Sequence, residues 1–332
     1  MRRRAVAALM LTMGTFSVAT SSETLEVVTR RAYLMGTRAQ LVTYAMRREA
    51  GLAALELALQ VLKTTERELS TWSNDSDMAV LNRHPIGEPW HANPHVCRML
   101  SEVFDWRATT AGAFDPAIGR LLAAWDIHGE GRMPSQTALA AARFSSGLGL
   151  LSLDRTRCTV TRRADVTIDV GAFGKGEALD RVEAALGNGP WMIDLGGQVS
   201  VGGPLPGHDA WTVDIAHPLQ RNRSHVQVRM REGSLSTSGG SERDLIVNGL
   251  RVAHLLDPRT GRPAPFSGSV TVWHRRGLIA DALSTALFVM GPAEGLPWAE
   301  ARGLAVCYLI PERDSVRVVM TSAFRPFTAP QS

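Results

Sequence analysis

The sequence has few cysteines, and its apolar run near the N-terminus is short. These two features argue against a disulfide-rich or zinc-binding protein and against a membrane-spanning protein. Only three cysteines, Cys97, Cys158 and Cys307, occur among 332 residues. Their odd number and wide spacing indicate neither a disulfide framework nor a zinc site, so we expect each to be a small buried apolar side chain. The apolar run from Ala5 to Val18 is shorter than the roughly 20 residues that span a bilayer.

Positive and negative side chains are nearly balanced, and the formal net charge is only +4. Part of it comes from arginines 2–4, and no basic run with interleaved aromatic residues is present, so nucleic acid is not an expected partner. The sequence also lacks the Ser-His-Asp nucleophile elbow, the His-Glu-x-x-His zinc helix, the Walker A loop and the Gly-x-Gly-x-x-Gly fingerprint. An apolar fraction of 45% is that of an ordinary globular chain.

The first 22 residues have the pattern of an export signal. Arginines 2–4 precede the apolar run, and small residues at 18–22 offer a cleavage site. No cysteine follows the run, so a lipid anchor is not expected. The paired arginines leave twin-arginine export open, and an uncleaved, marginal membrane anchor is the alternative. After processing we expect no stable membrane span and one domain over residues 23–332.

Helical and strand patterns alternate through that domain and predict an α+β fold with mostly antiparallel sheets and interleaved helices. The clearest helical stripe is formed by Leu52, Leu55, Leu59, Leu62 and Leu69. Further helices are expected at 78–82, 94–109, 121–125, 136–143 and from the glycines at 171–176 through 186. Strands are expected at 26–28, 38–44, 158–161, 166–170, 191–195, 211–215, 224–230, 233–237, 252–256, 270–273, 304–310 and 316–320.

The stretch 278–291 is read as a loop that enters a buried helix. Asp281 is expected at or near the N-cap, where its carboxylate can accept from free backbone N–H groups. Thr285 follows four residues later, so both side chains share one face. Such a pair could hold a hard cation such as Mg²⁺ with carbonyls and waters. The alternative is a plain cap and a threonine bonded to its own helix.

Three further stretches could carry chemistry. Residues 171–176, GAFGKG, separate a strand from a helix, where phosphates often bind; a tight turn is the alternative. Gly196 and Gly197 would let backbone N–H groups approach an anion, or would simply form a hairpin. His254 is expected on a strand, where it could act as a general base near neutral pH or could be a packed core histidine.

Taken in order, the motifs resemble the ApbE family, the FAD:protein FMN transferases. The resemblance covers nearly everything after the export segment. It rests on Met35-Gly36-Thr37, Leu69-Ser70-Thr71-Trp72 with Ser76 and Leu81-Asn82, Gly112 to Pro116 with Trp125, Ile168 to Gly171 through Lys175-Gly176 to Asp180, Asp194-Leu195-Gly196-Gly197, Thr237-Ser238-Gly239, His254 through Asp257-Pro258-Arg259-Thr260-Gly261 to Pro263, and Ala280-Asp281 to Thr285.

The resemblance implies a T-fold-like α+β structure with an FAD cleft between lobes and a requirement for Mg²⁺. Family members split FAD and pass FMN to a threonine of a target flavoprotein, releasing AMP. The targets are FMN-binding domains of Nqr-, Rnf- or NosR-type proteins, which fits export to the periplasm. Some members instead hydrolyse FAD to FMN and AMP. A flavin-binding or assembly protein without turnover is a third alternative.

The resemblance also assigns residues. Asp281, Thr285 and the carbonyl of Gly174, where the family usually has alanine, are implied as Mg²⁺ ligands. His254 matches the histidine that activates the acceptor hydroxyl. Positions implied at the FAD cleft are Met35, Asp115, Lys175, Gly196, Gly197, Ser238 and Asp257. Asp77, Ala117 and Asp194 depart from the residues usual in the family, and these departures concern fine FAD contacts.

Overall fold

The computed structural model describes residues 25–240, 244–247 and 249–328. Its strands are β1 (Glu26–Leu34), β2 (Thr37–Ala45), β3 (Pro89–His91), β4 (Leu151–Asp154), β5 (Thr159–Arg162), β6 (Trp191–Leu195), β7 (Gln198–Val201), β8 (Trp211–Ala216), β9 (Ser224–Met230), β10 (Gly233–Gly239), β11 (Leu245–Val247), β12 (Leu250–Val252), β13 (Leu256–Asp257), β14 (Arg262–Pro263), β15 (Ser269–His274), β16 (Ala305–Pro311) and β17 (Val316–Met320). Its helices are α1 (Arg48–Leu69), α2 (Asp77–Arg83), α3 (Pro94–Thr109), α4 (Gly119–Trp125), α5 (Gln136–Phe144), α6 (Gly174–Leu186) and α7 (Gly277–Glu300), with 3₁₀ turns at Leu148–Leu150 and Arg325–Phe327. The predicted export signal at residues 1–22 lies outside the described residues.

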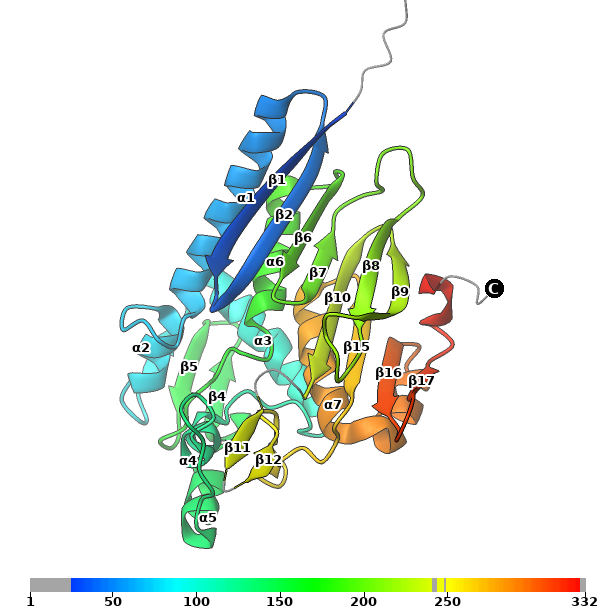
Figure 1. Ribbon diagram of the computed structural model, residues 1–332. Helices are drawn as coiled ribbons and strands as arrows, with labels where there is room; N and C mark the ends of the chain where they lie inside the picture. The colour runs from blue at the N-terminus through cyan, green and yellow to red at the C-terminus, as the bar shows by residue number, and fades with distance from the viewer. Residues whose placement is uncertain (1–24, 241–243, 248, 329–332) are drawn as a thin grey trace, which may run out of the picture.

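An eight-stranded sheet forms the centre of the molecule (Figure 1). Its strand order is β1-β2-β6-β7-β10-β15-β16-β17, and each neighbouring pair is antiparallel. Smaller antiparallel sheets, β3-β5-β4, β8-β9, β11-β12 and β13-β14, lie around it. The predicted α+β class with mostly antiparallel sheets is therefore confirmed.

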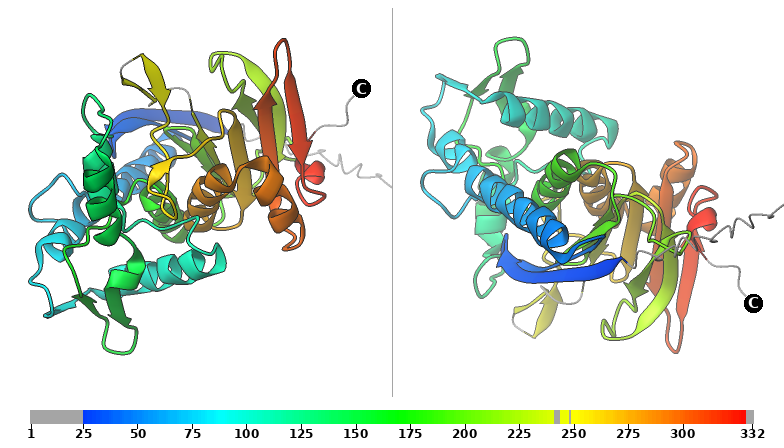
Figure 2. Two further views of the ribbon diagram at one scale, coloured as in Figure 1. Left: turned by 90° about the horizontal axis from the view of Figure 1, so that it is seen from below. Right: turned by 90° about the horizontal axis from the view of Figure 1, so that it is seen from above.

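The helices α1, α3, α6 and α7 gather on one side of this sheet, and the β8–β9 hairpin lies on the other (Figure 2). Strand β16 shows why both faces are buried: Val306 and Tyr308 pack into the core on the α7 side, and Cys307 and Leu309 pack with Trp211 of β8. This alternation follows from the two-residue period of a strand. Within the described part of the chain, no helix is both long and apolar enough to cross a membrane.

Helix α1 begins and ends close to where the leucine stripe predicts. Leu55, Leu59 and Leu62 are buried against Leu179 of α6 and Ile193 of β6. The period of 3.6 residues places these leucines on one face, and their burial explains why the two helices lie beside each other on the sheet. The α1–α6 layer thereby fixes the start of α6, which carries Gly174 and Lys175.

The predicted strand at 166–170 is wrong, because this segment is extended but joins no sheet. The side-chain amide of Asn82 replaces a strand partner: it accepts from the Ile168 N–H and donates to the Ile168 carbonyl, both at 2.8 Å. Asp169 N–H donates to the Pro116 carbonyl at 2.8 Å. Side-chain and loop partners therefore satisfy a backbone whose apolar alternation resembles that of a strand.

The expectation of three isolated buried cysteines is wrong for two of them. Cys97 of α3 and Cys158, which precedes β5, form a disulfide across 61 residues. The spacing alone gave no sign of it because the pair is brought together only by the packing of α3 against the β3-β5-β4 sheet. Cys307 is free and buried, as predicted, and burial raises the pKa of its thiol to about 12.

Candidate active site

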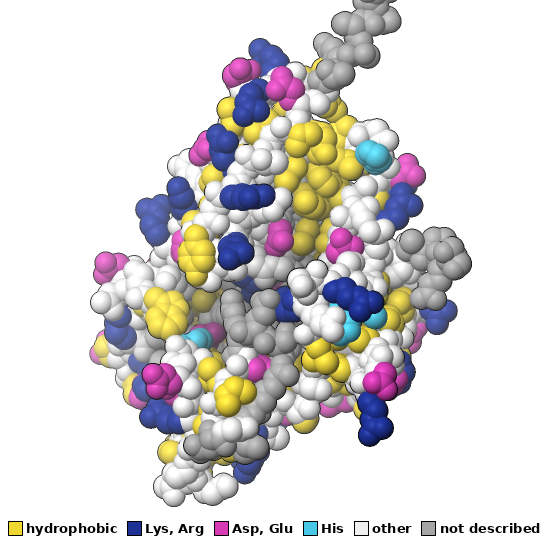
Figure 3. Space-filling view, in the orientation of Figure 1, with side chains coloured by type: hydrophobic (Ala, Val, Ile, Leu, Met, Phe, Trp, Pro, Cys, Tyr) yellow, Lys and Arg dark blue, Asp and Glu magenta, His cyan; other side chains and the backbone are white. Residues whose placement is uncertain are grey.

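A cavity of about 640 Å³ opens where the main sheet meets α6 and α7. Figure 3 shows this face of the molecule, where acidic and basic side chains lie around the centre. The cavity collects seven of the predicted site residues: Lys175, Gly196, Gly197, Ser238, His254, Asp281 and Thr285. They come from α6, the β6–β7 turn, β10, the segment before β13, and α7, so the fold gathers residues that are far apart in the sequence.

Two smaller cavities adjoin the first, and Gly171 lines all three. One, of about 390 Å³, is lined by Met35, Gly174 and Lys175 among others. The other, of about 160 Å³, is mainly apolar and is lined by Asp115 together with His254 and Thr285 of the first cavity. The three hollows together form a branched cleft, which is the shape that a long ligand with chemically different ends requires.

Asp281 lies inside helix α7 rather than at its N-cap, which corrects the sequence-based prediction. The helix begins at Gly277, so Asp281 is its fifth residue and is nearly buried. Its Oδ2 accepts the Gly176 N–H at 3.1 Å, and its Oδ1 accepts from the Ser236 hydroxyl at 3.3 Å. The Lys175 ammonium lies 3.5 Å from the same Oδ1. The carboxylate therefore joins α6, β10 and α7 at the cavity wall.

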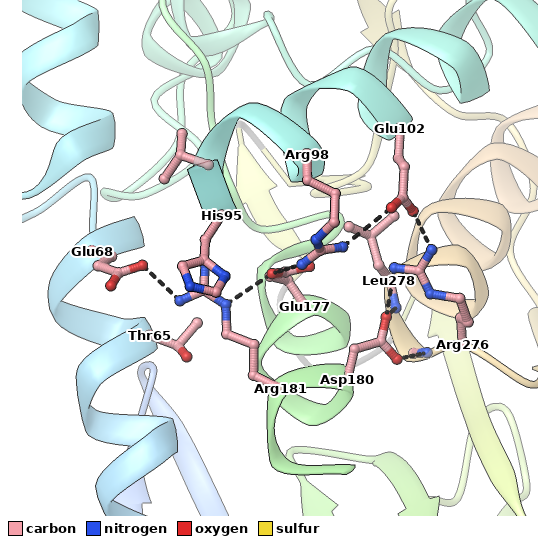
Figure 4. Close-up of polar contacts among 12 residues, drawn as sticks. Thr65, Glu68, His95, Arg98, Glu102, Glu177, Asp180, Arg181, Arg276 and Leu278 are labelled. Carbon is pink, nitrogen blue, oxygen red and sulfur yellow. Dashed lines mark hydrogen bonds and ion pairs between the residues drawn. The ribbon is translucent and has the colours of Figure 1, made fainter. Parts of the chain in front are cut away.

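The N-terminus of α7 is capped from another helix, by Asp180 of α6. Its carboxylate accepts the backbone N–H groups of Gly277 and Leu278, the latter at 3.1 Å (Figure 4). Free N–H groups at a helix start favour a negative partner. Burial raises the pKa of Asp180 to about 6, although those hydrogen bonds and Arg276 act in the opposite direction. Asp180 stands in the motif that carried the family resemblance, but its role could not be read from the sequence.

A chain of ion pairs continues from this cap across the helices (Figure 4). Glu102 of α3 forms ion pairs with two arginines: Arg276, at 2.6 Å, and Arg98, at 3.2 Å. Arg98 then pairs at 2.7 Å with Glu177 of α6, which is fully buried, and Glu177 also binds Arg181 at 2.8 Å. Because a buried carboxylate requires charged partners, this network ties α3, α6 and the start of α7 into one arrangement.

Helices α6 and α7 meet at two glycines. A Cβ atom on Gly176 would lie 2.2 Å from the Gly277 carbonyl oxygen, and one on Gly277 would lie 2.7 Å from the Gly176 carbonyl oxygen. Only residues without a side chain permit this approach. It places the Gly176 N–H against Asp281, and it sets the distance between the α6 start and the α7 face that holds Thr285.

The oxygen atoms that could hold a divalent cation are one carboxylate, one hydroxyl and backbone carbonyls. The described residues contain no cluster of three or more His, Cys, Asp or Glu side chains suited to a metal. Asp281 and Thr285 do line one cavity, and Thr285, although half-buried, makes no hydrogen bond through its hydroxyl to any described residue. Hard oxygen donors with open positions fit Mg²⁺, which retains waters and binds substrate phosphates.

His254 lies on a bend between β12 and β13, so the prediction of a continuous strand over 252–256 is wrong. Its backbone N–H donates to Asp244 Oδ1 at 3.2 Å, where a strand would provide a carbonyl. Its side chain lines both the main cavity and the apolar one, as does Thr285. The histidine therefore stands at the junction of two arms of the cleft.

The two glycines of the β6–β7 turn do not offer free N–H groups to an anion. Gly196 N–H donates to the Arg38 carbonyl at 3.0 Å, and Gly197 N–H donates to Asp194 Oδ1 at 2.8 Å. Burial raises the pKa of the Asp194 carboxyl. Gly196 has a φ of 63°, and a Cβ there would lie 2.4 Å from Thr37 Oγ1. These glycines shape the wall, so an anion in the cavity would meet nearby cationic side chains instead of their N–H groups.

Those cations are Arg38 and Arg221, which line the main cavity with Lys175. Arg221 belongs to the turn between β8 and β9, and its guanidinium lies 3.8 Å from the position of a Cβ on Gly197. Neither arginine could be identified from sequence alone, because the chain carries arginines throughout and no local motif marks these two.

Asp115 and Asp257 are placed less directly at the cleft. Asp115 lines the apolar cavity, but its carboxylate accepts from the N–H groups of Ala117 and Leu148 at 3.0 Å. Burial raises its pKa. Asp257 lines none of the three cavities; its carboxylate binds Arg259 through the backbone N–H at 2.9 Å and Nε at 3.0 Å. Both aspartates organise loops whose other residues form the cleft wall.

The geometry can be compared with known proteins. A model described as the ApbE family matches residues 35–308. The FAD:protein FMN transferase of Vibrio cholerae is 28% identical to this chain over 278 residues, which cover 81% of this chain and 82% of that protein. The FAD:protein FMN transferase of Klebsiella pneumoniae is 29% identical over 292 residues, which cover 84% of this chain and 83% of that protein. A crystal structure of the ApbE protein from Thermotoga maritima matches with a TM-score of 0.84 and 26% sequence identity. The match covers 92% of this chain and 100% of that chain.

A second solved structure, the apo form of the flavinyl transferase ApbE from Pseudomonas stutzeri, has a TM-score of 0.81 and 28% identity. It covers 91% of this chain and 97% of that one. The family match spans most of the sequence, and each structural match covers more than nine tenths of this chain. This chain belongs to the ApbE family.

Proposed function

We propose that this chain is a Mg²⁺-dependent FAD:protein FMN transferase, which splits FAD, attaches FMN through a phosphoester to a threonine of a target flavoprotein and releases AMP. The observation that carries the proposal is the convergence of Asp281, Thr285 and His254 on one cavity. Relatives with this activity in their names align with four fifths of the chain, which supports the same assignment.

In the proposed function Asp281, Thr285 and the Gly174 carbonyl are the groups of this chain that would hold the metal. When bound, Mg²⁺ would neutralise the charge that develops on the phosphate oxygens as the phosphoanhydride breaks. Lys175, beside Asp281, adds a second positive charge close to the same place. Gly174 begins α6, one residue before Lys175, so the carbonyl that would hold the metal and the ammonium lie next to each other in the chain.

His254 takes the proton from the attacking group. The threonine oxygen forms a bond to the FMN phosphorus, the phosphorus–oxygen bond to AMP breaks, and the hydroxyl proton moves to a ring nitrogen of His254. A positioned general base of this kind contributes about 10²–10⁴-fold to the rate. If water enters in place of threonine, the same residues hydrolyse FAD to FMN and AMP.

The target and the compartment belong to the proposal as well. We propose an exported, periplasmic enzyme whose targets are FMN-binding domains of Nqr-, Rnf- or NosR-type proteins. The Cys97–Cys158 disulfide supports the compartment, because disulfides persist mainly in oxidising surroundings such as the periplasm. The pattern of the first 22 residues supports export.

One incubation tests the activity. The purified protein is mixed with FAD, MgCl₂ and a candidate target domain, and the products are separated on a denaturing gel and by chromatography. The proposal predicts yellow-green flavin fluorescence that stays with the denatured target, together with AMP in equal amount. Free FMN and AMP without labelled target would mean hydrolysis, and intact FAD in both fractions would contradict the proposal.

A further inference from the structure

The Asp244 carboxylate holds both the ring and the backbone of His254. Asp244 Oδ1 lies 3.1 Å from His254 Nδ1, and the same oxygen accepts the His254 backbone N–H at 3.2 Å. The two residues flank the β11–β12 hairpin in the chain and lie at its open end: Asp244 immediately precedes β11 and His254 follows β12. The hairpin therefore brings together two groups that are ten residues apart.

The buried contact with the Asp244 carboxylate favours one tautomer of the imidazole, the one protonated at Nδ1. The side chain of Asp244 is 6% exposed and that of His254 is 20% exposed. An ionised carboxylate only accepts hydrogen bonds, so the nitrogen that faces it must carry a hydrogen. A neutral His254 is consequently protonated at Nδ1, which leaves the lone pair on Nε2.

The second ring nitrogen is left available for chemistry. His254 Nε2 has no hydrogen-bond partner among the residues that the structure describes, and the ring lines both the main and the apolar cavity with Thr285. An imidazole whose far side is fixed and whose near side opens into a cleft has the geometry of an oriented general base.

We propose that Asp244 is a positioning residue for His254: it locks the ring and the Nδ1–H tautomer, so that Nε2 accepts the proton of the attacking hydroxyl. This inference rests on the proposed function. In the step, the proton leaves the hydroxyl oxygen and joins Nε2, while Nδ1 keeps its hydrogen and Asp244 stays ionised. The carboxylate stabilises the imidazolium cation that results.

The first test needs neither FAD nor metal. The ¹⁵N spectrum of histidine-labelled protein is recorded without ligands, with His254 identified by its disappearance in His254→Gln. We expect a protonated Nδ1 and an unprotonated Nε2 in the neutral ring of the wild type. Asp244→Asn, whose amide can donate to Nδ1, should shift the ring toward the Nε2–H form. A wild-type ring protonated at Nε2, or the same tautomer in both proteins, would overturn the proposal.

The second test is kinetic and includes a matched control. Asp244→Asn should lower kcat about 100-fold, within the range of general-base catalysis, while KM for FAD changes less than twofold. In a His254→Gln background it should cause no further loss, because the two residues act as one unit. Asp214→Asn, an exposed β8 aspartate bonded to Ser224 at 2.8 Å, should leave kcat unchanged.

An unchanged kcat in Asp244→Asn, or a loss that adds fully to that of His254→Gln, would contradict the positioning role. If the wild type transfers no FMN at all, the proposed function fails, and the ligand-free spectrum alone then decides whether Asp244 fixes the tautomer. Circular dichroism and thermal unfolding of Asp244→Asn show that any loss of activity occurs in a folded protein.

Discussion

The ammonium of Lys175 lies 3.5 Å from Oδ1 of Asp281, at the wall of the main cavity. The carboxylate is nearly buried and the lysine side chain is 23% exposed. In the proposed function the same carboxylate would also hold a metal ion, so the ammonium and the metal would share it. The carboxylate attracts both the ammonium and the metal ion, but the two cations repel each other, so each weakens the binding of the other.

Replacing Lys175 with methionine should therefore separate metal binding from FAD binding. With a competing cation removed, the FAD-free protein should bind Mg²⁺ about fivefold more tightly, which corresponds to about 1 kcal/mol for a partly exposed pair. KM for FAD should rise, because a positive charge near the phosphates is lost. Calorimetric titration with MgCl₂ and steady-state kinetics measure the two effects.

Lys63→Met is the control, because Lys63 is the only other lysine in the sequence and is exposed on α1. It should alter neither quantity. Weaker Mg²⁺ binding in Lys175→Met than in the wild type would show that the ammonium supports the metal instead of competing with it.

The contact between α6 and α7 should tolerate no side chain at Gly176. Gly176→Ala forces a Cβ to within 2.2 Å of the Gly277 carbonyl oxygen, so we expect the free energy of unfolding to fall by about 3 kcal/mol. Urea denaturation of the variant measures the loss. The backbone would have to separate at the place where Asp281 binds the Gly176 N–H, so activity should fall with it.

Gly174→Ala, two residues earlier, is the matched control. A Cβ there meets Val170 at 3.4 Å and Met35 at 3.7 Å, which are ordinary contacts. Because alanine favours the helix, the free energy of unfolding should stay the same or rise by up to about 1 kcal/mol. Activity should be retained, since the backbone carbonyl is unchanged. Equal effects of the two substitutions would contradict the close helix contact.

The contribution of Asp180 to the free energy of unfolding should fall as the pH rises, which is the opposite of what most native-state carboxylates show. Its folded-state pKa of about 6 lies above the ordinary aspartate pKa of 3.8, so the native state binds the proton more tightly than the unfolded chain. This group therefore contributes stability at low pH that is lost as the pH rises from about 4 to about 6, by about 3 kcal/mol in total.

The measurement is the free energy of unfolding of the wild type minus that of Asp180→Asn, from urea denaturation at pH 4.5, 5.5 and 7. Other titrating groups cancel in this difference. We expect the difference to shift against the wild type as the pH rises, with most of the change below pH 6.5. A difference that is flat, or that moves in favour of the wild type, would show that the hydrogen bonds to Gly277 and Leu278 outweigh burial.

Much of the fold could be predicted because local patterns and burial agree. The apolar spacing after Pro94 gave α3 its observed ends, Pro94–Thr109, and Asn93 caps it through the N–H groups of His95 and Val96. The alternation in β6 likewise gave Trp191–Leu195. Where a side chain replaces a backbone partner, as Asn82 does for Ile168, the same alternation predicted a strand that does not form.

The candidate site was predictable as a set of residues but not as an arrangement. The motifs named Asp281, Thr285 and His254, and the structure brings all three to one cavity. The residues that hold them in place were not identified. Asp180 acts on α7 across 98 positions, and Asp244 acts on His254 only through the fold of a hairpin. Such contacts leave no periodic signal, because they depend on packing between elements.

The most direct test of the account is FMN transfer by Asp281→Asn as a function of Mg²⁺ concentration. The amide keeps the size of the side chain and one acceptor oxygen, but it removes the negative charge that the metal requires. We predict at least a 100-fold lower rate at limiting Mg²⁺, with Asp214→Asn indistinguishable from the wild type. A rate for Asp281→Asn equal to that of the wild type at limiting Mg²⁺ would contradict the claim that this carboxylate holds the metal.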